Sequence, residues 1–425
     1  MEQDTKGIAT PLLESLPSGS ASKLQTLGNI IVSVVGTGLL GLPFAFRIAG
    51  WLAGLLGVAI AGISTYYCML LLVMCREKLA SEGSSAEART YGDLGYRTMG
   101  NTGRYLTEFF ILVGQCGASV AYLVFIGQNL VAVFQYNGLT FSSYIFLLVP
   151  IEIGLSWIGS LSTLAPFSIF ADICNILAMG IVVKEAIQHA LGAGFSFGER
   201  TAITSNIGGL PFALGMALFC FEGFGMTLAL ENSMKDRTKF PRLLAQTFSG
   251  ITLVYILLGF SGYMAFGDET KDIIILNLPR NWSSLAIQVG LCLGLVFTFP
   301  MMMHPVNEIV EGKMKCWKWF NNPFPSHKDD GNSITKLGKI VSYITRAIVV
   351  SVLAILASFV PAFGVFASFV GSTVCAMLSF VLPATFHLKL FGSSLHLWQK
   401  VLDSIIVICG LLFAIYGTYN AVVGV

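Results

Sequence analysis

Charged side chains are scarce in this sequence. Asp, Glu, Lys and Arg make up 11% of the 425 residues, against roughly 25% in soluble domains, and hydrophobic residues make up 55%. A soluble core has no use for that much apolar surface, so the composition excludes an ordinary soluble domain. The net charge is only +2, and no basic stretch is interleaved with aromatic residues, so we expect no nucleic-acid partner.

The residue patterns of catalytic and metal sites are also missing. No HExxH, GxSxG or phosphate-binding loop occurs, so we do not expect an enzyme. The nine cysteines include no pair with metal-ligand or CxxC spacing. Most of them lie in apolar stretches, where they are typical of small buried hydrophobic residues. We therefore expect neither a metal nor a cofactor.

The chain begins with a polar segment, residues 1–22, that is rich in Ser, Gly and Pro. It lacks the basic start and apolar core of a signal peptide, so we expect a disordered cytosolic tail. Residues 23–425 then form one polytopic all-α membrane domain embedded in the lipid bilayer.

Long apolar runs dominate the rest of the sequence. A membrane span needs about 20 mostly apolar residues. Eleven stretches are candidates for spans: 24–46, 51–75, 105–134, 143–158, 164–187, 208–231, 243–266, 284–309, 340–360, 362–387 and 401–423.

Lys and Arg are distributed unevenly between the loops. If the N-terminus is cytosolic, most of the 25 basic residues fall in loops on that side, chiefly 76–104, 235–242 and 313–339. An excess of Lys and Arg marks the cytoplasmic face. Eleven spans then place the C-terminus on the lumenal or extracellular side.

Glu222 lies in the middle of the sixth apolar stretch. A carboxylate at bilayer depth costs roughly 2.5–3.5 kcal/mol on insertion scales. Gly223 and Gly225 weaken the helix at the same place. A charge and a helix break together favour a transport site. The alternative is a carboxyl group that pairs with a neighbouring helix and fixes the bundle.

The first apolar stretch is interrupted in a similar way, by Gly36, Thr37 and Gly38. If the first ten spans form two sets of five, both breaks fall in the first span of a set. Interrupted helices in corresponding positions of two halves are the best sequence indication of a transporter's binding site. Alone, the glycines at 36 and 38 would be equally consistent with close helix–helix contact.

A broken helix has a definite preference for ligands. It leaves free N–H groups at one new end and free C=O groups at the other. Such groups are tolerated at membrane depth where they line a cavity. The N–H end attracts a carboxylate and the C=O end attracts a cation. A ligand that carries both charges is a zwitterionic amino acid.

Several ordered motifs resemble those of the amino acid/auxin permease family. They are Gly-Thr-Gly-Leu-Leu-Gly-Leu-Pro at 36–43, Thr-Tyr-Gly-Asp-Leu-Gly-Tyr at 90–96, Phe-Glu-Gly-Phe-Gly at 221–225, Gly-Tyr-Met-Ala-Phe-Gly-Asp at 262–268 and Asn-Leu-Pro at 277–279. Segments 44–54 and 115–122 are most similar to the plant aromatic and neutral amino acid transporters of that family. The resemblance covers the chain from about residue 24 to the C-terminus.

This resemblance implies a fold and a function. The fold is a LeuT-type inverted repeat of five plus five helices, at about 24–187 and 208–388, with an added helix at about 398–423. The function is proton-coupled transport of neutral, here aromatic, amino acids by alternating access, by a monomer in the vacuole or another endomembrane. The plasma membrane is the alternative location.

One departure from the family bears on the proton. The animal proton-coupled branch carries a histidine about seven residues before the first-span motif, where this sequence has Asn29. Coupling through an acid is then the better hypothesis. We expect Glu222 to carry the proton and Asp172 to assist it, although Asp172 could instead pair with a neighbouring helix.

The side-chain pocket is expected between the third, sixth and eighth spans. Aromatic faces near Glu222 suit an apolar substrate, and three residues of the third span share one helix face at i, i+3 and i+6. The alternative for all of them is bundle packing. The candidate substrate-binding residues are Val35, Gly36, Thr37, Gly38, Leu39, Cys116, Ser119, Tyr122, Phe219, Phe221, Gly223 and Phe224.

Three alternatives stay open at the level of sequence. The chain could carry indole acids of the auxin type, or it could be a membrane sensor that binds amino acids without net flux. Sodium could replace the proton, because Thr298 lies near an expected bend before Pro300 where an ion site could form.

Overall fold

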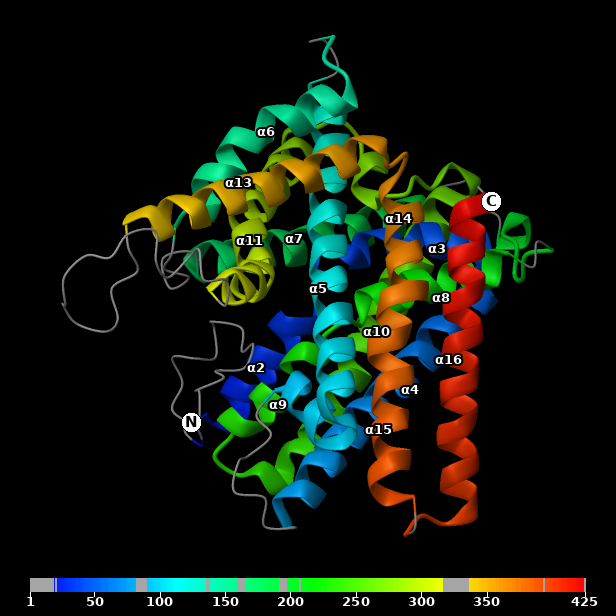
Figure 1. The fold of residues 1–425 in the computed structure, drawn as a ribbon. Coiled ribbons are helices and arrows are strands. Elements are labelled where there is room, and N and C mark those ends of the chain that lie inside the picture. The colour runs from blue at the N-terminus through cyan, green and yellow to red at the C-terminus, as the bar shows by residue number, and fades with distance from the viewer. Residues whose placement is uncertain are drawn as a thin grey trace.

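The computed structural model describes residues 19, 21–81, 90–134, 138–158, 165–190, 197–205, 208–315, 336–392 and 394–423. Almost all of them are helical (Figure 1). Among the described residues, the β structure consists of one isolated bridge between Ala21 and Met234. Most of the expected N-terminal tail, residues 1–22, lies outside the described residues.

Each predicted apolar stretch coincides with a helix or with a broken pair of helices. In chain order they are α2 (Lys23–Val34) with η1 (Thr37–Gly41) and α3 (Leu42–Ala49), α4 (Trp51–Ser81), α5 (Tyr91–Val133), α6 (Phe141–Ser156), α7 (Ala165–Ala190), α8 (Gly209–Cys220) with α9 (Phe224–Ser233), α10 (Phe240–Phe266), α11 (Trp282–Lys315), α13 (Lys336–Phe359), α14 (Phe363–Val370) with η7 (Gly371–Cys375), η8 (Met377–Val381) and α15 (Leu382–Phe391), and α16 (Leu397–Val423).

Fewer helices meet the length and composition of a membrane span than the eleven predicted stretches. Within the described residues, eight helical segments are long and apolar enough to cross a membrane, or nine if the bent pair α2 and η1–α3 is one span. α6 has 16 residues, which is short for a span, and α7 is not among the segments that qualify. The count of eleven therefore stays a prediction.

α5 begins well before the predicted start of the third span. The Thr90 hydroxyl accepts a hydrogen bond from the Asp93 backbone N–H, and the Asp93 carboxylate accepts one from the Thr90 N–H, which forms a capping box. Gly100 then turns the chain with a φ of 66°. The part before this turn packs against the part after it, because a Cβ on Gly95 would lie 2.7 Å from the Gly103 oxygen.

Both predicted helix breaks are present. α2 ends at Val34, and the chain bends by 49° before it continues as η1 and α3. α8 ends at Cys220, and α9 begins at Phe224. Gly36 and Gly223 are the N-cap residues of the second segments, and neither cap makes a side-chain hydrogen bond.

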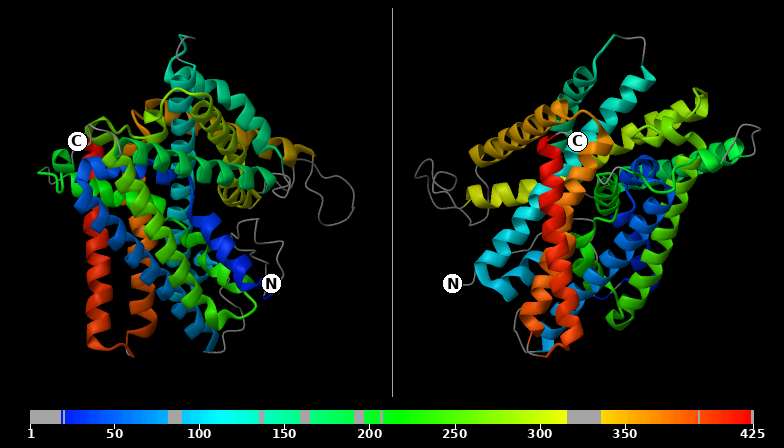
Figure 2. Two further views of the ribbon diagram at one scale, coloured as in Figure 1. Left: turned by 180° about the vertical axis from the view of Figure 1, so that it is seen from behind. Right: turned by 90° about the vertical axis from the view of Figure 1, so that its right-hand side faces the viewer.

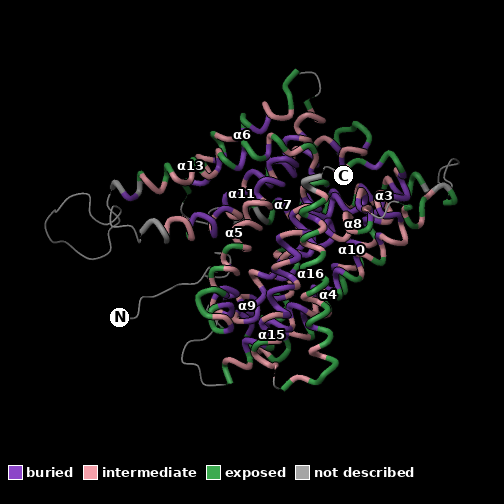
Figure 3. Tube along the Cα trace, turned by 45° about the vertical axis from the view of Figure 1, so that its right-hand side comes forward, coloured by how far each residue is buried: buried purple, intermediate pink, exposed green. Residues whose placement is uncertain are grey.

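The broken spans lie at the centre of the bundle. α2 contacts α9, α3 contacts α8, and α10 packs against both parts of the first span. The two views of Figure 2 show the other helices gathered around this centre. In Figure 3 buried segments concentrate there, whereas α6, α13 and α16 carry exposed outer faces.

One end of the molecule collects several chain connections. The end of α4, the start of α5 and the link between α15 and α16 lie together at the bottom of Figure 1. At this end the Lys78 ammonium donates to the Leu390 carbonyl. Arg76 forms a buried ion pair with Glu231 and also donates to the Asn232 side chain, which ties α4 to α9.

The tenth span departs from α-helical geometry. Residues 371–375 and 377–381 form π-helical turns. A Cβ on Gly371 would lie 1.8 Å from the Gly215 oxygen, so this span touches α8 backbone to backbone. On its other side α16 is held by a buried pair, in which His387 Nδ1 lies 2.6 Å from Asp403 Oδ2. The Tyr67 hydroxyl of α4 donates to the same carboxylate at 3.2 Å.

Candidate substrate site

A cavity of about 330 Å³ lies between the two breaks. This volume falls in the range of small-molecule sites, roughly 300–1,000 Å³. Its walls come from α2 and the first break, α5, α7, the break between α8 and α9, α11, and the tenth span. The prediction of a pocket between the third, sixth and eighth spans thus omitted the fifth and tenth.

Several residues of the cavity wall carry unpaired polar atoms. Among the described residues, four buried side-chain oxygens of its wall have no hydrogen-bond partner: Thr37 Oγ1, Gln115 Oε1, Asn175 Oδ1 and Glu222 Oε2. Buried polar atoms are nearly always paired, and an unpaired one costs about 1–3 kcal/mol. Four of them in the wall of one cavity indicate a place where a polar ligand completes the hydrogen bonding.

Glu222 lies in the gap between α8 and α9. Its carboxylate accepts hydrogen bonds from the backbone N–H groups of Gly223 and Phe224 and from the Cys375 thiol. The Glu222 side chain is partly buried, and Glu222 is one of the residues that line the cavity. The N-terminus of α9 therefore stabilises the negative charge, and the remaining oxygen is available for a proton or a ligand.

The first break supplies backbone donors on the opposite wall. Thr37 and Gly38 are the first residues of η1, so their N–H groups lack a partner within that helix. A Cβ on Gly36 would meet no atom within 4 Å, whereas a Cβ on Gly38 would lie 3.1 Å from the Phe219 ring. The space in the Cβ direction is thus open at Gly36, whereas the Phe219 ring fills it at Gly38.

The structure brings together most of the residues predicted for the site. Those that line the cavity are Val35, Gly36, Thr37, Gly38, Tyr122, Asp172, Phe219, Glu222 and Gly223. Asn29 lies in the same wall. These residues come from four separate stretches of sequence.

Three predicted residues at the breaks do not reach the cavity. Leu39, Phe221 and Phe224 are all almost completely buried in the core. The Phe221 ring packs against the rings of Phe248 and Tyr255, with centroids 6.0 and 4.9 Å apart. Of the three phenylalanines predicted for the pocket, Phe219 lines the cavity, whereas Phe221 and Phe224 pack into the scaffold.

Of the three residues predicted on α5, Tyr122 lines the cavity, whereas Cys116 and Ser119 each lie one position after a residue of the wall. Ser119 is fully buried and donates to the Met303 sulfur at 3.3 Å, and Cys116 is not part of the cavity wall. Between residues 111 and 122 of α5, the wall consists of Ile111, Gly114, Gln115, Ala118 and Tyr122. The last four follow Ile111 by three, four, seven and eleven positions, which is the usual spacing of residues on one face of an α-helix. This spacing can be read from the sequence and could have identified Gln115.

The cavity extends beyond the predicted site towards the start of α5. Thr90, Tyr91 and Gly92 belong to its wall, as do Arg104 and Glu108, whose Nε and Oε1 atoms are 2.7 Å apart. The sequence motif at 90–96 is therefore part of the cavity.

Hydrogen bonds link the opposite end of the site to the loop between α10 and α11. Arg47 donates to the Thr270 carbonyl at 2.9 Å. The Gln128 amide donates to Asp272 at 3.0 Å, and its oxygen accepts from the Phe363 N–H at 3.4 Å. Four segments of the chain are thus joined above the first break, on the side away from Arg104.

Solved structures confirm the type of fold. The chain superimposes on the crystal structure of MhsT in complex with L-phenylalanine with a TM-score of 0.56. The match covers 95% of this chain and 100% of the other, at 13% sequence identity. The likeness supports the LeuT-type fold expected from sequence.

Sequence relatives carry the comparison further. The chain is 61% identical to amino acid transporter ANT1 of Arabidopsis thaliana over 99% of its own length and 98% of the relative's. It is 28% identical to vacuolar amino acid transporter 4 of Saccharomyces cerevisiae, over 97% of this chain and 60% of the yeast protein. The profile described as transmembrane amino acid transporter protein matches residues 19–423. The chain belongs to this family of transporters, which is not a family of enzymes.

Proposed function

We propose that the protein is a proton-coupled transporter of neutral amino acids, with a preference for aromatic ones, that works by alternating access. The observation that carries this proposal is the set of four unpaired polar atoms between two broken helices. An amino acid matches such a site, because its ammonium can donate to the unpaired oxygens and its carboxylate can accept from the free N–H groups of the first break. The names of the relatives in Arabidopsis and yeast support the same class of substrate.

The two charged groups of an amino acid have separate places in this proposal. The carboxylate binds the N–H groups at Thr37 and Gly38, where the first break presents the positive end of η1. The ammonium lies near Glu222 and the carbonyls at the end of α8. The cavity is open at Gly36 between these two positions.

The rest of the cavity suits an apolar side chain. Phe219 and Tyr122 provide aromatic faces, and Met301, Met302 and Val370 add flexible and aliphatic surface. Indole acids would fit the same apolar wall. However, they lack the ammonium group that the carbonyls at the end of α8 would bind.

Glu222 is the proposed proton carrier. It is a carboxyl group in the wall of the cavity, with one oxygen held by α9 and the other without a partner among the described residues. Asp172 of α7 faces the same cavity and is the second candidate. Glu222 would change its protonation between the two states of alternating access, while the carbonyls at the end of α8 hold the ammonium, which links the movement of the proton to that of the substrate.

The proposed orientation follows the basic residues of the loops. The N-terminus and the Arg104 end of the cavity face the cytosol, and the C-terminus faces the lumen or the exterior. The cavity described here is then continuous with the cytosolic side, and the contacts of Asp272 and Gln128 close the other side. The yeast relative's name favours the vacuole as the location.

Flux in proteoliposomes tests the proposed function. The purified protein should accumulate labelled phenylalanine when a pH gradient is imposed, and a sodium gradient at constant pH should not replace it. Binding without flux would identify a sensor. Uptake of an indole acid but not of phenylalanine would identify an auxin-type carrier.

A further inference from the structure

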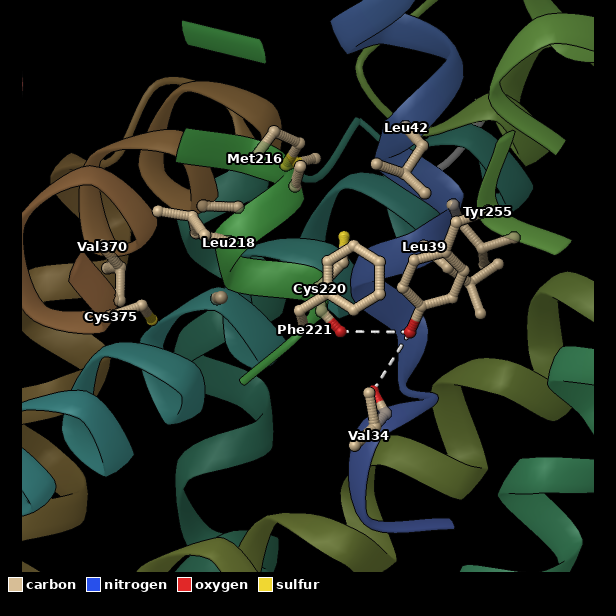
Figure 4. Close-up of a cluster of buried hydrophobic side chains, with 14 of the residues drawn as sticks. Val34, Leu39, Leu42, Met216, Leu218, Cys220, Phe221, Tyr255, Val370 and Cys375 are labelled. Atoms are coloured by element: carbon tan, nitrogen blue, oxygen red, sulfur yellow. Dashed lines mark hydrogen bonds between the residues drawn. The ribbon is translucent and has the colours of Figure 1, made fainter. Parts of the chain in front are cut away.

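One hydroxyl group connects the two breaks. Tyr255 of α10 is completely buried, and its oxygen lies 3.2 Å from the Val34 carbonyl and 3.0 Å from the Cys220 carbonyl (Figure 4). Val34 is the last residue of α2, and Cys220 is the last residue of α8. A third helix therefore bridges the ends of both broken helices.

The two carbonyls need this contact. The last carbonyls of a helix have no acceptor role within it, and an unpaired carbonyl at membrane depth is costly. Val34 and Cys220 both line the cavity. A carbonyl oxygen has two lone pairs, so each can bind the hydroxyl and still face a ligand.

The Tyr255 ring is held in a fixed place. It packs against Phe221, which in turn stacks on Phe248 of the same helix α10. α10 also contacts α2, η1 and α3. The hydroxyl carries a single proton, so both carbonyls must stay close to one point for that proton to serve them.

We propose that Tyr255 is a positioning residue that sets the distance between the two breaks. This inference rests on the proposed function and adds the basis of its specificity. A ligand with a carboxylate and an ammonium on one carbon must bind both breaks at once, so it requires a fixed separation. A ligand with only one of these charges uses one break and does not depend on that separation.

Tyr255→Phe tests the proposal, because it removes the hydroxyl and keeps the ring. Inhibition constants would be measured against labelled phenylalanine for three ligands: phenylalanine, its deaminated acid 3-phenylpropionate, and its decarboxylated amine 2-phenylethylamine. We expect affinity for phenylalanine to fall about tenfold, the effect of about 1.4 kcal/mol from one lost hydrogen bond. The affinities for the acid and the amine should stay within twofold of the wild type.

Tyr263→Phe is the matched control. Tyr263 lies on the same helix and is also buried, and its hydroxyl accepts a hydrogen bond from the Thr201 N–H at 3.2 Å, away from both breaks. This variant should bind all three ligands like the wild type. Tyr255→Met lacks the hydroxyl too, and it repeats the comparison if Tyr255→Phe does not reach the membrane.

Two results would overturn the proposal. One is an unchanged affinity of Tyr255→Phe for phenylalanine. The other is an equal loss for all three ligands, which would mean that the hydroxyl only supports the bundle. If neither single-charge ligand inhibits any variant, the phenylalanine affinities of the Tyr255 and Tyr263 variants decide. Failure of the wild-type protein to bind or move phenylalanine would instead refute the proposed function.

Discussion

Replacement of Glu222 by glutamine should abolish proton coupling and leave folding and substrate binding intact. The amide has nearly the same size, and its oxygen can still accept from the Gly223 and Phe224 N–H groups. Loss of the negative charge next to the α9 N-terminus is offset by removal of a charge from the membrane interior. We expect the free energy of unfolding to change by less than about 1 kcal/mol, so the variant should fold and reach the membrane.

The size of the transport effect follows from the number of protons. One carboxyl group that binds and releases one proton in each cycle couples one proton to one amino acid. With the membrane voltage held at zero, each pH unit is then worth about 1.4 kcal/mol, or a tenfold accumulation. A gradient of two units should give the wild type about a hundredfold accumulation. Glu222→Gln should equalise the two concentrations.

The assay is uptake of labelled phenylalanine into proteoliposomes, with potassium and valinomycin on both sides to hold the voltage at zero. Exchange of labelled for unlabelled phenylalanine, which needs no net proton movement, shows that the variant still binds and turns over. Asp172→Asn is the matched control for a second acid in the same cavity. A hundredfold accumulation by Glu222→Gln would remove Glu222 from the coupling mechanism, and equalised concentrations with Asp172→Asn alone would assign the proton to Asp172.

Three further substitutions test the site and its frame. Gly36→Val should fold, because a Cβ there meets no atom within 4 Å, but its side chain enters the cavity, so phenylalanine affinity by equilibrium binding should fall at least tenfold. A wild-type affinity would place the substrate elsewhere. Glu231→Ala leaves the buried Arg76 charge without this carboxylate and should lower the unfolding free energy by about 3 kcal/mol in a denaturation series. Gly371→Ala should cost about 1–3 kcal/mol by forcing the tenth span away from the α8 backbone. Its melting midpoint is compared with that of Gly250→Ala, where the added methyl group meets nothing within 4 Å, and equal midpoints would contradict the close contact.

The two breaks could be predicted from sequence because their causes are local. Glycine weakens a helix wherever it stands, and a carboxylate in an apolar run has few explanations. The predicted breaks at Gly36 and Glu222 therefore agree with the ends of α2 and α8. The family resemblance supplied the fold, which no single span reveals.

Which residues form the cavity wall could not be predicted fully, because it depends on contacts between residues that are far apart in the sequence. Once a helix is broken, the direction of the next side chain is set by packing, as the burial of Phe221 against Tyr255 illustrates. The tenth span forms π-helical turns at residues 371–375 and 377–381, and Val370 and Cys375 line the cavity. The Tyr255 hydroxyl contacts Val34, which is 221 positions away in the sequence, and Cys220, which is 35 positions away. No spacing rule predicts either contact.

The buried His387–Asp403 pair also constrains how the chain enters the bilayer during synthesis. Asp403 is fully enclosed, and an aspartate in a helix that inserts alone would have to face lipid without its partner. α15 ends at Phe391 and α16 begins at Leu397, so the two residues leave the ribosome within a few seconds of each other. The last two helices can therefore enter the membrane as one hairpin, with the acid already matched to its base. A chain that stops after α15 would keep His387 but lose Asp403. The final helix therefore supplies the partner of a buried side chain in α15.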